Sequence, residues 1–357
     1  MASFPKVILV GSLSLFSIIG VLAVAKKQKD KNAADNQENL SVEDSSEAMG
    51  PSPSHIDHIK YIEPHTPVLR TSQPAKLIVN EDDEDDVDRI YQFYSTGPNK
   101  LPIVETISYT SRVPWLKGRP AWIADYASHF KTSRHFIARS LNGKPDYYTQ
   151  KVAPGDRFNV LRTDMNFNFY LLVDLSRCKM YFYYIDLDTN ERVLLKTYKV
   201  GVGRFDDYSE SGTLTPLGRF TLGEKIAIYK PGIMGFFQGS QTEMVQVFGT
   251  RWIPFEPAEE NNNRAYKGYG IHGAPLIPES SGEFIEDQNG ISKYDSDGCV
   301  RLANKDMEEL FSIVITRPTV VEIVRDKALV ELPGFEKNED KKSLEFAKDV
   351  KSREANS

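Results

Sequence analysis

Residues 168–203 read NFYLLVDLSRCKMYFYYIDLDTNERVLLKTYKVGVG, a run dense in aromatic and aliphatic side chains. This pattern predicts two or three β-strands, with DLDTNE at 186–191 as a hairpin turn. Further short runs at 213–229, 244–255 and 268–275 are separated by Gly, Pro and Asn turns. Many short strands with such turns predict a mainly β fold, either a barrel or a sandwich.

One helix is expected inside this β-rich part, over residues 306–314 (DMEELFSIV), followed by a last strand in 317–325. Asp306 and Glu309 have the spacing of a capping box, with Asp306 at the N-cap. The β-rich domain is therefore expected to span 165–328, before a charged tail over 329–357.

A smaller unit is expected before it, at 105–164, with the element order β-α-α-β. A strand-like stretch at 107–113 precedes two short helices at 120–130 and 132–142, the second capped by Ser133. A PGD turn then leads into a strand at 157–161.

The first thirty residues predict a signal anchor. Residues 7–25 carry no charge and are long enough to cross a hydrocarbon core of roughly 30 Å as a helix. The AVA at 23–25 leaves a cleaved signal peptide open. The lysines at 26–31 favour a cytoplasmic side instead, but export is the preferred interpretation.

Residues 31–104 have the composition of a linker, with a solvated acidic block at 81–88. Three histidines in it, His55, His58 and His65, lack the spacing of metal ligands. The net charge of -6 also argues against a nucleic-acid partner.

The chain has two cysteines. Cys178 lies in a strand-like stretch and is expected to be a half-buried free thiol, so a Cys178–Cys299 disulfide is not expected. Cys299 follows Gly298, and His272 is the one histidine in the same domain. A cysteine nucleophile needs a base and amide donors for an oxyanion, so Cys299 and His272 are a candidate pair. A core histidine beside an inert thiol is the alternative.

These residues belong to a longer pattern, GIHGA…SDGCVRLANKDMEELF…PTVVEIV, with TPLGRF upstream at 215–220. Over about 168–326 it closely resembles the L,D-transpeptidase catalytic (YkuD-type) domain. The motif positions are His272, Gly273, Ser296, Gly298, Cys299, Val300, Arg301, Asn304 and Asp306.

The resemblance implies a peptidoglycan L,D-transpeptidase of mostly β fold, with no metal or organic cofactor. Cys299 would be the nucleophile and His272 the general base, and the imidazolium would stabilise the thiolate. Backbone amides at Gly298 and Cys299 would hold the oxyanion, and Ser296 would fix the pocket geometry.

Two further motif residues are expected at the substrate. Arg301 would meet a substrate carboxylate or form a structural ion pair, and Gly273 would contact substrate. Water as acceptor would make the enzyme an L,D-carboxypeptidase, and a decayed site would leave a wall-binding protein.

Two features depart from the family pattern. Asp297 stands where the family has a histidine, and it would either orient His272 or face solvent. The loop 274–295 is longer than usual and would be a lid or a surface insertion.

The unit at 105–164 resembles a LysM module through RSLN at 139–142 and APGD at 153–156. The usual Gly-Asp-Thr opening is absent, so either glycan binding or a spacer role is expected. The implied partners are stem peptides and glycan strands. The implied location is the bacterial cell envelope, on the inner membrane with the catalytic domain in the periplasm.

Overall fold

The computed structural model describes residues 77–78, 86–143, 151–224, 226–257 and 267–336, all within one compact unit of residues 50–357. The predicted anchor at 7–25 lies outside the described residues. No helix in the described part of the chain is both long and apolar enough to span a membrane.

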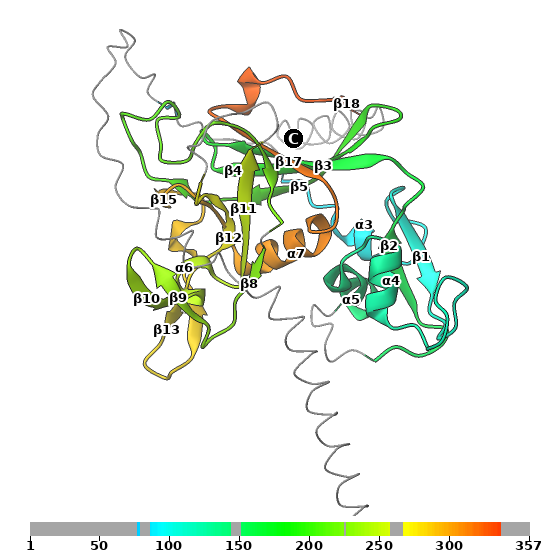
Figure 1. The fold of residues 1–357 in the computed structure, drawn as a ribbon. Helices are drawn as coiled ribbons and strands as arrows, with labels where there is room; N and C mark the ends of the chain where they lie inside the picture. Colours follow the sequence, from blue (N-terminus) through cyan, green and yellow to red (C-terminus); the bar gives the residue numbers. More distant parts are fainter. Residues whose placement is uncertain (1–76, 79–85, 144–150, 225, 258–266, 337–357) are drawn as a thin grey trace, which may run out of the picture. The chain divides into compact units, whose positions relative to one another are not determined.

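One large sheet dominates the fold (Figure 1), in the order β16–β12–β11–β7–β17–β3–β4–β5–β18, with β8 paired to β11. Its strands are β3 (Phe167–Asp174), β4 (Lys179–Asp186), β5 (Glu191–Lys199), β7 (Gly218–Leu222), β8 (Ala227–Ile228), β11 (Arg251–Pro257), β12 (Gly270–Gly273), β16 (Val300–Leu302), β17 (Thr319–Val324) and β18 (Phe335–Glu336). The prediction of a mainly β fold is confirmed.

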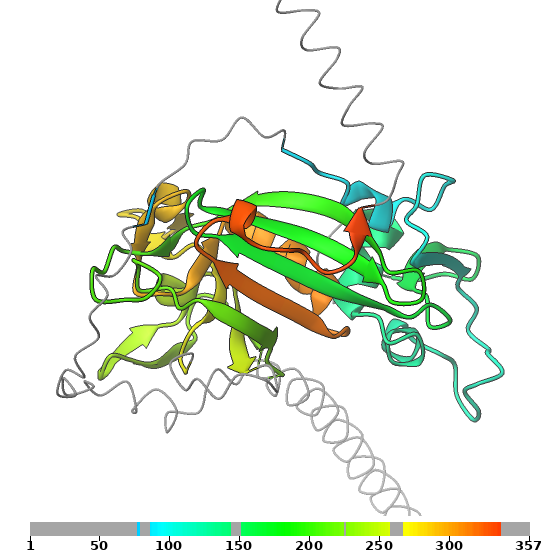
Figure 2. The same cartoon turned by 90° about the horizontal axis from the view of Figure 1, so that it is seen from above.

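Burial on both faces explains why β3, at the start of the apolar run 168–203, carries almost only apolar side chains. Successive side chains on a strand point to opposite faces, and both faces of β3 are buried. Phe169 and Leu171 pack into the main core, while Tyr170 and Leu172 pack into a second cluster on the other face. The long strands β3, β4, β5 and β17 lie side by side in Figure 2. The predicted turn at 186–191 joins β4 to β5 as an antiparallel hairpin.

Smaller two-stranded sheets flank this sheet: β6 (Val202–Gly203) with β15 (Tyr294–Ser296), β9 (Met234–Phe237) with β10 (Ser240–Glu243), and β13 (Leu276–Pro278) with β14 (Phe284–Glu286). Short helical turns are α6 (Val245–Phe248), η2 (Gln288–Gly290) and η3 (Lys327–Leu329). The long loop 274–295 therefore folds into regular elements, and Leu276 and Phe284 pack against the cluster that contains Trp252.

Helix α7 (Asn304–Val314) confirms the predicted helix, but the predicted capping box is wrong. The helix begins at Asn304, and Ala303 at the N-cap makes no side-chain cap. Asp306 and Glu309 instead accept hydrogen bonds from Lys196 Nζ, at 3.0 and 2.7 Å. The two carboxylates are drawn to a buried lysine on β5, so they bind across the fold rather than to their own helix end.

The order β-α-α-β appears before the main sheet, as β1 (Val104–Ser108), α4 (Ile123–His129), α5 (Arg134–Asn142) and β2 (Arg157–Leu161). Strands β1 and β2 pair antiparallel, and Ser133 Oγ accepts from Phe136 N at 3.1 Å as the predicted N-cap. The resemblance to a LysM module stays a prediction.

The range expected for the linker, 31–104, contains regular structure in its described residues. Helix α3 (Tyr91–Tyr94) lies there, and Phe93 is buried in the main core. Asp88 pairs with Lys196 Nζ at 3.2 Å, so the end of the acidic block joins the same ion cluster as α7. In the charged tail, β18 pairs with β5 and residues 337–357 lie outside the described part.

Candidate active site

Neighbouring strands bring His272 and Cys299 together. Strand β12 pairs parallel with β16, and His272 lies opposite Arg301. Cys299 immediately precedes β16, one residue before the Val300–Ile271 pair. The histidine and the cysteine therefore line one pocket although a long segment of chain separates them.

The turn that carries Cys299 is braced by Ser296. The buried Ser296 Oγ donates to the Cys299 carbonyl at 2.6 Å and accepts from Gly298 N at 3.1 Å. Gly298 has φ +117°, which a side chain rarely adopts, and a Cβ there would lie 2.4 Å from the Tyr269 ring. The turn therefore needs glycine at 298 and a small hydroxyl residue at 296.

Of the two backbone N–H groups expected to bind an oxyanion, the turn engages one. The Gly298 N–H is engaged by Ser296 Oγ. The Cys299 N–H makes no hydrogen bond to any described residue. In this arrangement Cys299 N–H is the donor available to an oxyanion, and Gly298 shapes the turn.

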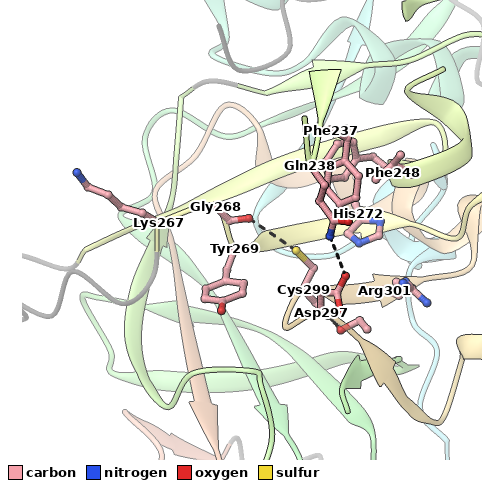
Figure 3. A pocket seen from close by; sticks show the side chains of 12 residues that line it. Phe237, Gln238, Phe248, Lys267, Gly268, Tyr269, His272, Asp297, Cys299 and Arg301 are labelled. Atoms are coloured by element: carbon pink, nitrogen blue, oxygen red, sulfur yellow. Dashed lines mark hydrogen bonds between the residues drawn. The ribbon is translucent and has the colours of Figure 1, made fainter. Parts of the chain in front are cut away.

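The Cys299 thiol is held against the backbone of β12 and the residues before it. Its Sγ donates weakly to the Gly268 carbonyl at 3.9 Å, as Figure 3 shows, and accepts from the Gly270 amide. Burial raises the pKa of the thiol to about 12; the Gly270 amide and Arg301 oppose this shift, while Asp297 adds to it. The resting group is therefore a neutral thiol.

His272 is fixed in one orientation by main-chain carbonyls. Its Nδ1 lies 2.7 Å from the Gly273 carbonyl oxygen, and because a carbonyl only accepts, Nδ1 carries the proton and Nε2 carries the free lone pair. Burial lowers the pKa of His272 to about 3, and Arg301 lowers it further, while the carbonyls of Gly273 and Phe248 oppose the shift. The imidazole is therefore neutral above about pH 4.

The pocket around these groups is a cavity of about 140 Å³. That is smaller than the roughly 300–1,000 Å³ of drug-sized ligand sites, and it suits a short part of a larger, extended substrate. The lining residues are Phe237, Gln238, Val247, Phe248, Lys267, Gly268, Tyr269, His272, Ser296, Asp297, Cys299 and Arg301. Residues 274–295 contribute none of them, whereas the β9–β10 hairpin contributes Phe237 and Gln238.

Of the two residues expected at the substrate, Arg301 lines the pocket and Gly273 does not. Arg301 lines the pocket, but its Nη1 also pairs with Asp295 at 3.1 Å, so the ion-pair alternative is realised. Gly273 is buried and lies outside the pocket lining, where its carbonyl orients His272. Asp297 lines the pocket, is about half-exposed and pairs with Arg204 and Gln238, so it neither contacts His272 in the described structure nor simply faces solvent.

Two residues at this site were missed from the sequence. Arg204 and Gln238 lie outside the motif segments, and they meet Asp297 only through the fold. The departure from the family pattern at position 297 was the signal in the sequence, because a carboxylate there can pair with a cationic or amide side chain.

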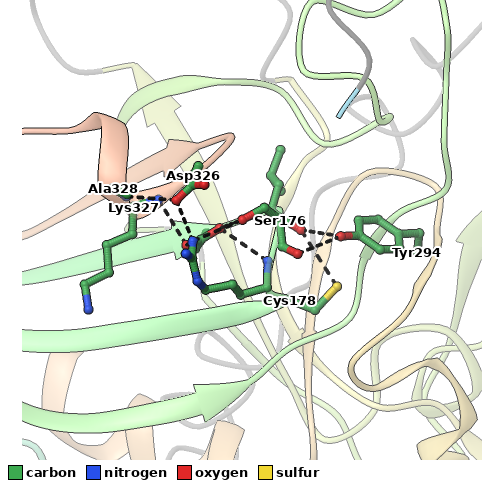
Figure 4. A network of polar contacts seen from close by, with 9 residues as sticks. Ser176, Cys178, Tyr294, Asp326, Lys327 and Ala328 are labelled. Atoms are coloured by element: carbon green, nitrogen blue, oxygen red, sulfur yellow. Dashed lines mark hydrogen bonds and ion pairs between the residues drawn. The ribbon is translucent and has the colours of Figure 1, made fainter. Parts of the chain in front are cut away.

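Cys178 lies in a different environment, the turn between β3 and β4 (Figure 4). Both cysteines are free, as expected, but Cys178 is buried rather than half-buried. Tyr294 donates to the Leu175 carbonyl at 2.7 Å, while Arg177 binds Asp174 and Asp326 around the same turn. Burial raises the pKa of Cys178 to about 11, so this thiol is inert.

No group of three or more His, Cys, Asp or Glu side chains in the described ranges is placed to hold a metal ion. The expectation that the enzyme works without metal or cofactor stays a prediction.

Comparison with known families identifies the fold around this pocket. Residues 168–323 match the YkuD family model, the L,D-transpeptidase catalytic domain. The matched range is less than half of the chain and contains Cys299, His272 and Ser296. We refer to it as the YkuD domain.

Several solved structures are distantly similar to this chain. The helical cell shape determining protein Pgp2 from Campylobacter jejuni is 17% identical, with a TM-score of 0.30, over 45% of this chain and 49% of that one. Bd1075 from Bdellovibrio bacteriovorus is 18% identical, with a TM-score of 0.30, over 44% of this chain and 48% of that one. L,D-transpeptidase 3 from Mycobacterium tuberculosis is 11% identical, with a TM-score of 0.26, over 48% of this chain and 76% of that one.

The matched region thus spans about half the length of the first two proteins. No curated protein matches this chain.

Proposed function

We propose that the YkuD domain is a peptidoglycan L,D-transpeptidase with Cys299 as nucleophile. The observation that carries this proposal is the pocket shared by Cys299 and an oriented His272, whose Nδ1 is committed to the Gly273 carbonyl. Its Nε2 is the remaining base, and the Cys299 amide is a free donor for an oxyanion. The YkuD match supplies the class of reaction.

The proposed first step is acylation. As Cys299 Sγ attacks the carbonyl at the L-centre of the third stem residue, its proton passes to His272 Nε2. The tetrahedral intermediate collapses, the bond to the terminal D-amino acid breaks, and the leaving amine takes that proton. Because the thiol pKa is about 12 and the imidazole pKa about 3, proton transfer accompanies attack rather than preceding it.

The second step is transfer. An amine of another stem gives a proton to His272 and attacks the thioester, so that an amide forms and the thiol is regenerated. Water in place of the amine would give hydrolysis.

Incubation of the full-length protein with a disaccharide-tetrapeptide tests the proposal, with products and intact protein read by mass spectrometry. We expect a crosslinked dimer and a thioacyl adduct on the parent protein, neither of them with Cys299→Ala. Cys178→Ser is the matched control and should behave as the parent. Tripeptide alone would replace transfer by hydrolysis, and identical results for parent and Cys299→Ala would overturn the enzyme assignment.

We further propose that residues 7–25 anchor the protein in the inner membrane with the YkuD domain outside it, and that the unit with α4 and α5 contacts glycan. The uncharged run at 7–25 supports the first proposal and the exposed Trp122 beside α4 the second. Protease digestion of intact spheroplasts should degrade the YkuD domain. Insoluble glycan strands freed of stem peptides should retain the protein less after Trp122→Ala.

A further inference from the structure

The tip of the β9–β10 hairpin reaches the turn that carries the nucleophile. The two strands form their own two-stranded sheet, outside the main one. Gln238, at the tip, donates from Nε2 to Asp297 Oδ2 at 3.4 Å, as drawn in Figure 3. Phe237, beside it, packs edge-on against Phe248, with ring centroids 5.7 Å apart. The hairpin thus touches the site at one polar and one apolar point.

The polar point is completed by Arg204. Its guanidinium forms an ion pair with the other oxygen of Asp297. The backbone of Arg204 is itself fixed, because its N–H donates to the Ser296 carbonyl and its carbonyl accepts from Leu214 N, both at 2.9 Å. Arg204 therefore presents a cation from a segment attached to the nucleophile turn, and Asp297 lies between this cation and the hairpin tip.

The apolar point leads to the base. Phe248 also packs edge-on against the His272 ring, with centroids 5.4 Å apart. Gly235 on β9 lies so close to Met244 that a Cβ would meet its sulfur at 2.7 Å. The hairpin therefore packs against α6 and the residue before it. Asp297 contacts the hairpin at the pocket.

We infer that Asp297 is a positioning residue that, together with Arg204 and Gln238, holds the β9–β10 hairpin across the entrance to the Cys299 pocket and so limits the size of group that reaches the sulfur. We call these three residues the Asp297 bridge. The inference concerns access to the thiol and does not depend on the proposed reaction.

Arg204 offsets the negative charge of Asp297 near the Cys299 thiol. A carboxylate two residues from the nucleophile disfavours a thiolate, and a guanidinium on that carboxylate offsets its charge. Both side chains are about half-exposed, at 61% and 54%, so salt screens their attraction. Exposed pairs of this kind shift an equilibrium by roughly two- to five-fold.

The test measures how size affects access to Cys299. The full-length protein carries Cys178→Ser, which leaves Cys299 as its one thiol. Alkylation by N-ethylmaleimide is compared with that by a polyethylene-glycol maleimide, which has the same reactive group on a bulky chain. The ratio of the bulky to the small rate cancels any change in the thiol pKa.

We expect Gln238→Ala and Arg204→Gln each to raise this ratio about two- to five-fold, the range typical of exposed ion pairs. High salt should raise it for the parent and much less for Arg204→Gln. Gln241→Ala, on the exposed face of the same hairpin, is the matched control and should leave it unchanged. Asp297→Asn should raise both the ratio and the small-reagent rate.

Equal ratios for the parent and all bridge variants would overturn the inference, as would an equal rise for Gln241→Ala. Because no peptidoglycan is present, failure here is distinguishable from failure of the proposed transpeptidase reaction. Circular dichroism on each variant separates a local opening from loss of the fold.

Discussion

The Ser296 hydroxyl donates to the Cys299 carbonyl at 2.6 Å and accepts from the Gly298 amide at 3.1 Å. Ser296→Ala removes both bonds inside a buried turn, so we expect a loss of about 1–3 kcal/mol in the free energy of unfolding. A displaced sulfur should lower the acylation rate about ten- to hundred-fold. Denaturant unfolding and acyl-enzyme formation measure the two effects. Ser281→Ala, at an exposed turn, should change neither; an unchanged acylation rate in Ser296→Ala would contradict the bracing role.

Gly298→Ala should destabilise the turn by contact as well as by backbone strain. The new Cβ would lie 2.4 Å from the Tyr269 ring and 2.7 Å from the Leu214 carbonyl. Gly282 also has a positive φ but has open space around it, so Gly282→Ala isolates the strain. We expect Gly298→Ala to lose about 1–3 kcal/mol more than this control, from overpacking. Equal losses in urea unfolding would show that the contacts are relieved at no cost.

Lys196→Met should be strongly destabilising. The lysine is 9% exposed and binds Asp306 and Glu309, so its removal leaves both carboxylates without their cation. Loss of one partner from such a buried cluster costs about 3–5 kcal/mol. Lys199→Met, at an exposed position on the same strand, should cost little. Urea unfolding measures the free energy of unfolding of both variants. Similar losses for the two would contradict a stabilising role for the Lys196 ion cluster.

Acid should destabilise the protein through two buried histidines. Burial lowers the pKa of both His135 and His272 to about 3. Between about pH 6.5 and pH 3 the unfolded chain binds these protons and the folded chain does not, so stability falls as the pH falls. Each histidine should contribute up to about 1.4 kcal/mol per pH unit. The glutamine variant of either should flatten the profile of unfolding free energy against pH, and an unchanged slope would refute this origin.

The alkylation rate of Cys299 should keep rising with pH. With the thiol pKa at about 12, the thiolate fraction increases about ten-fold per pH unit from pH 7 to pH 10. Peptide mapping by mass spectrometry separates Cys299 from Cys178, and the denatured protein should level off near pH 9. A plateau near pH 7 in the folded protein would instead indicate a preformed thiolate–imidazolium pair.

Much of the fold could be predicted from local patterns. The dense apolar run and its turn residues predicted the β4–β5 hairpin, and Ser133 before an apolar face predicted the start of α5. The capping box at Asp306 failed because Lys196, distant in sequence, competes for both carboxylates. Local spacing carries no information about such a partner.

The candidate site, too, could be predicted only in part. Cys299 and His272 came from a motif, and the parallel pairing of β12 and β16 accounts for their shared pocket. Gly298 was expected to offer its amide to an oxyanion, but Ser296 takes that amide at a distance no motif specifies. The partners of Asp297 were beyond prediction, because only the folded chain brings Arg204 and the hairpin tip to that carboxylate.

Because β12 pairs with β16, the relative position of His272 and Cys299 does not depend on the length of the segment between them. His272 and Cys299 are placed by adjacent strands, while the intervening segment turns back on itself in the exposed residues 279–283, between β13 and β14. This turn is accordingly a natural point at which to fuse a reporter or to open new termini by circular permutation. Diversification of the same turn would let a lineage acquire new surface contacts while the chemistry beneath stays constant.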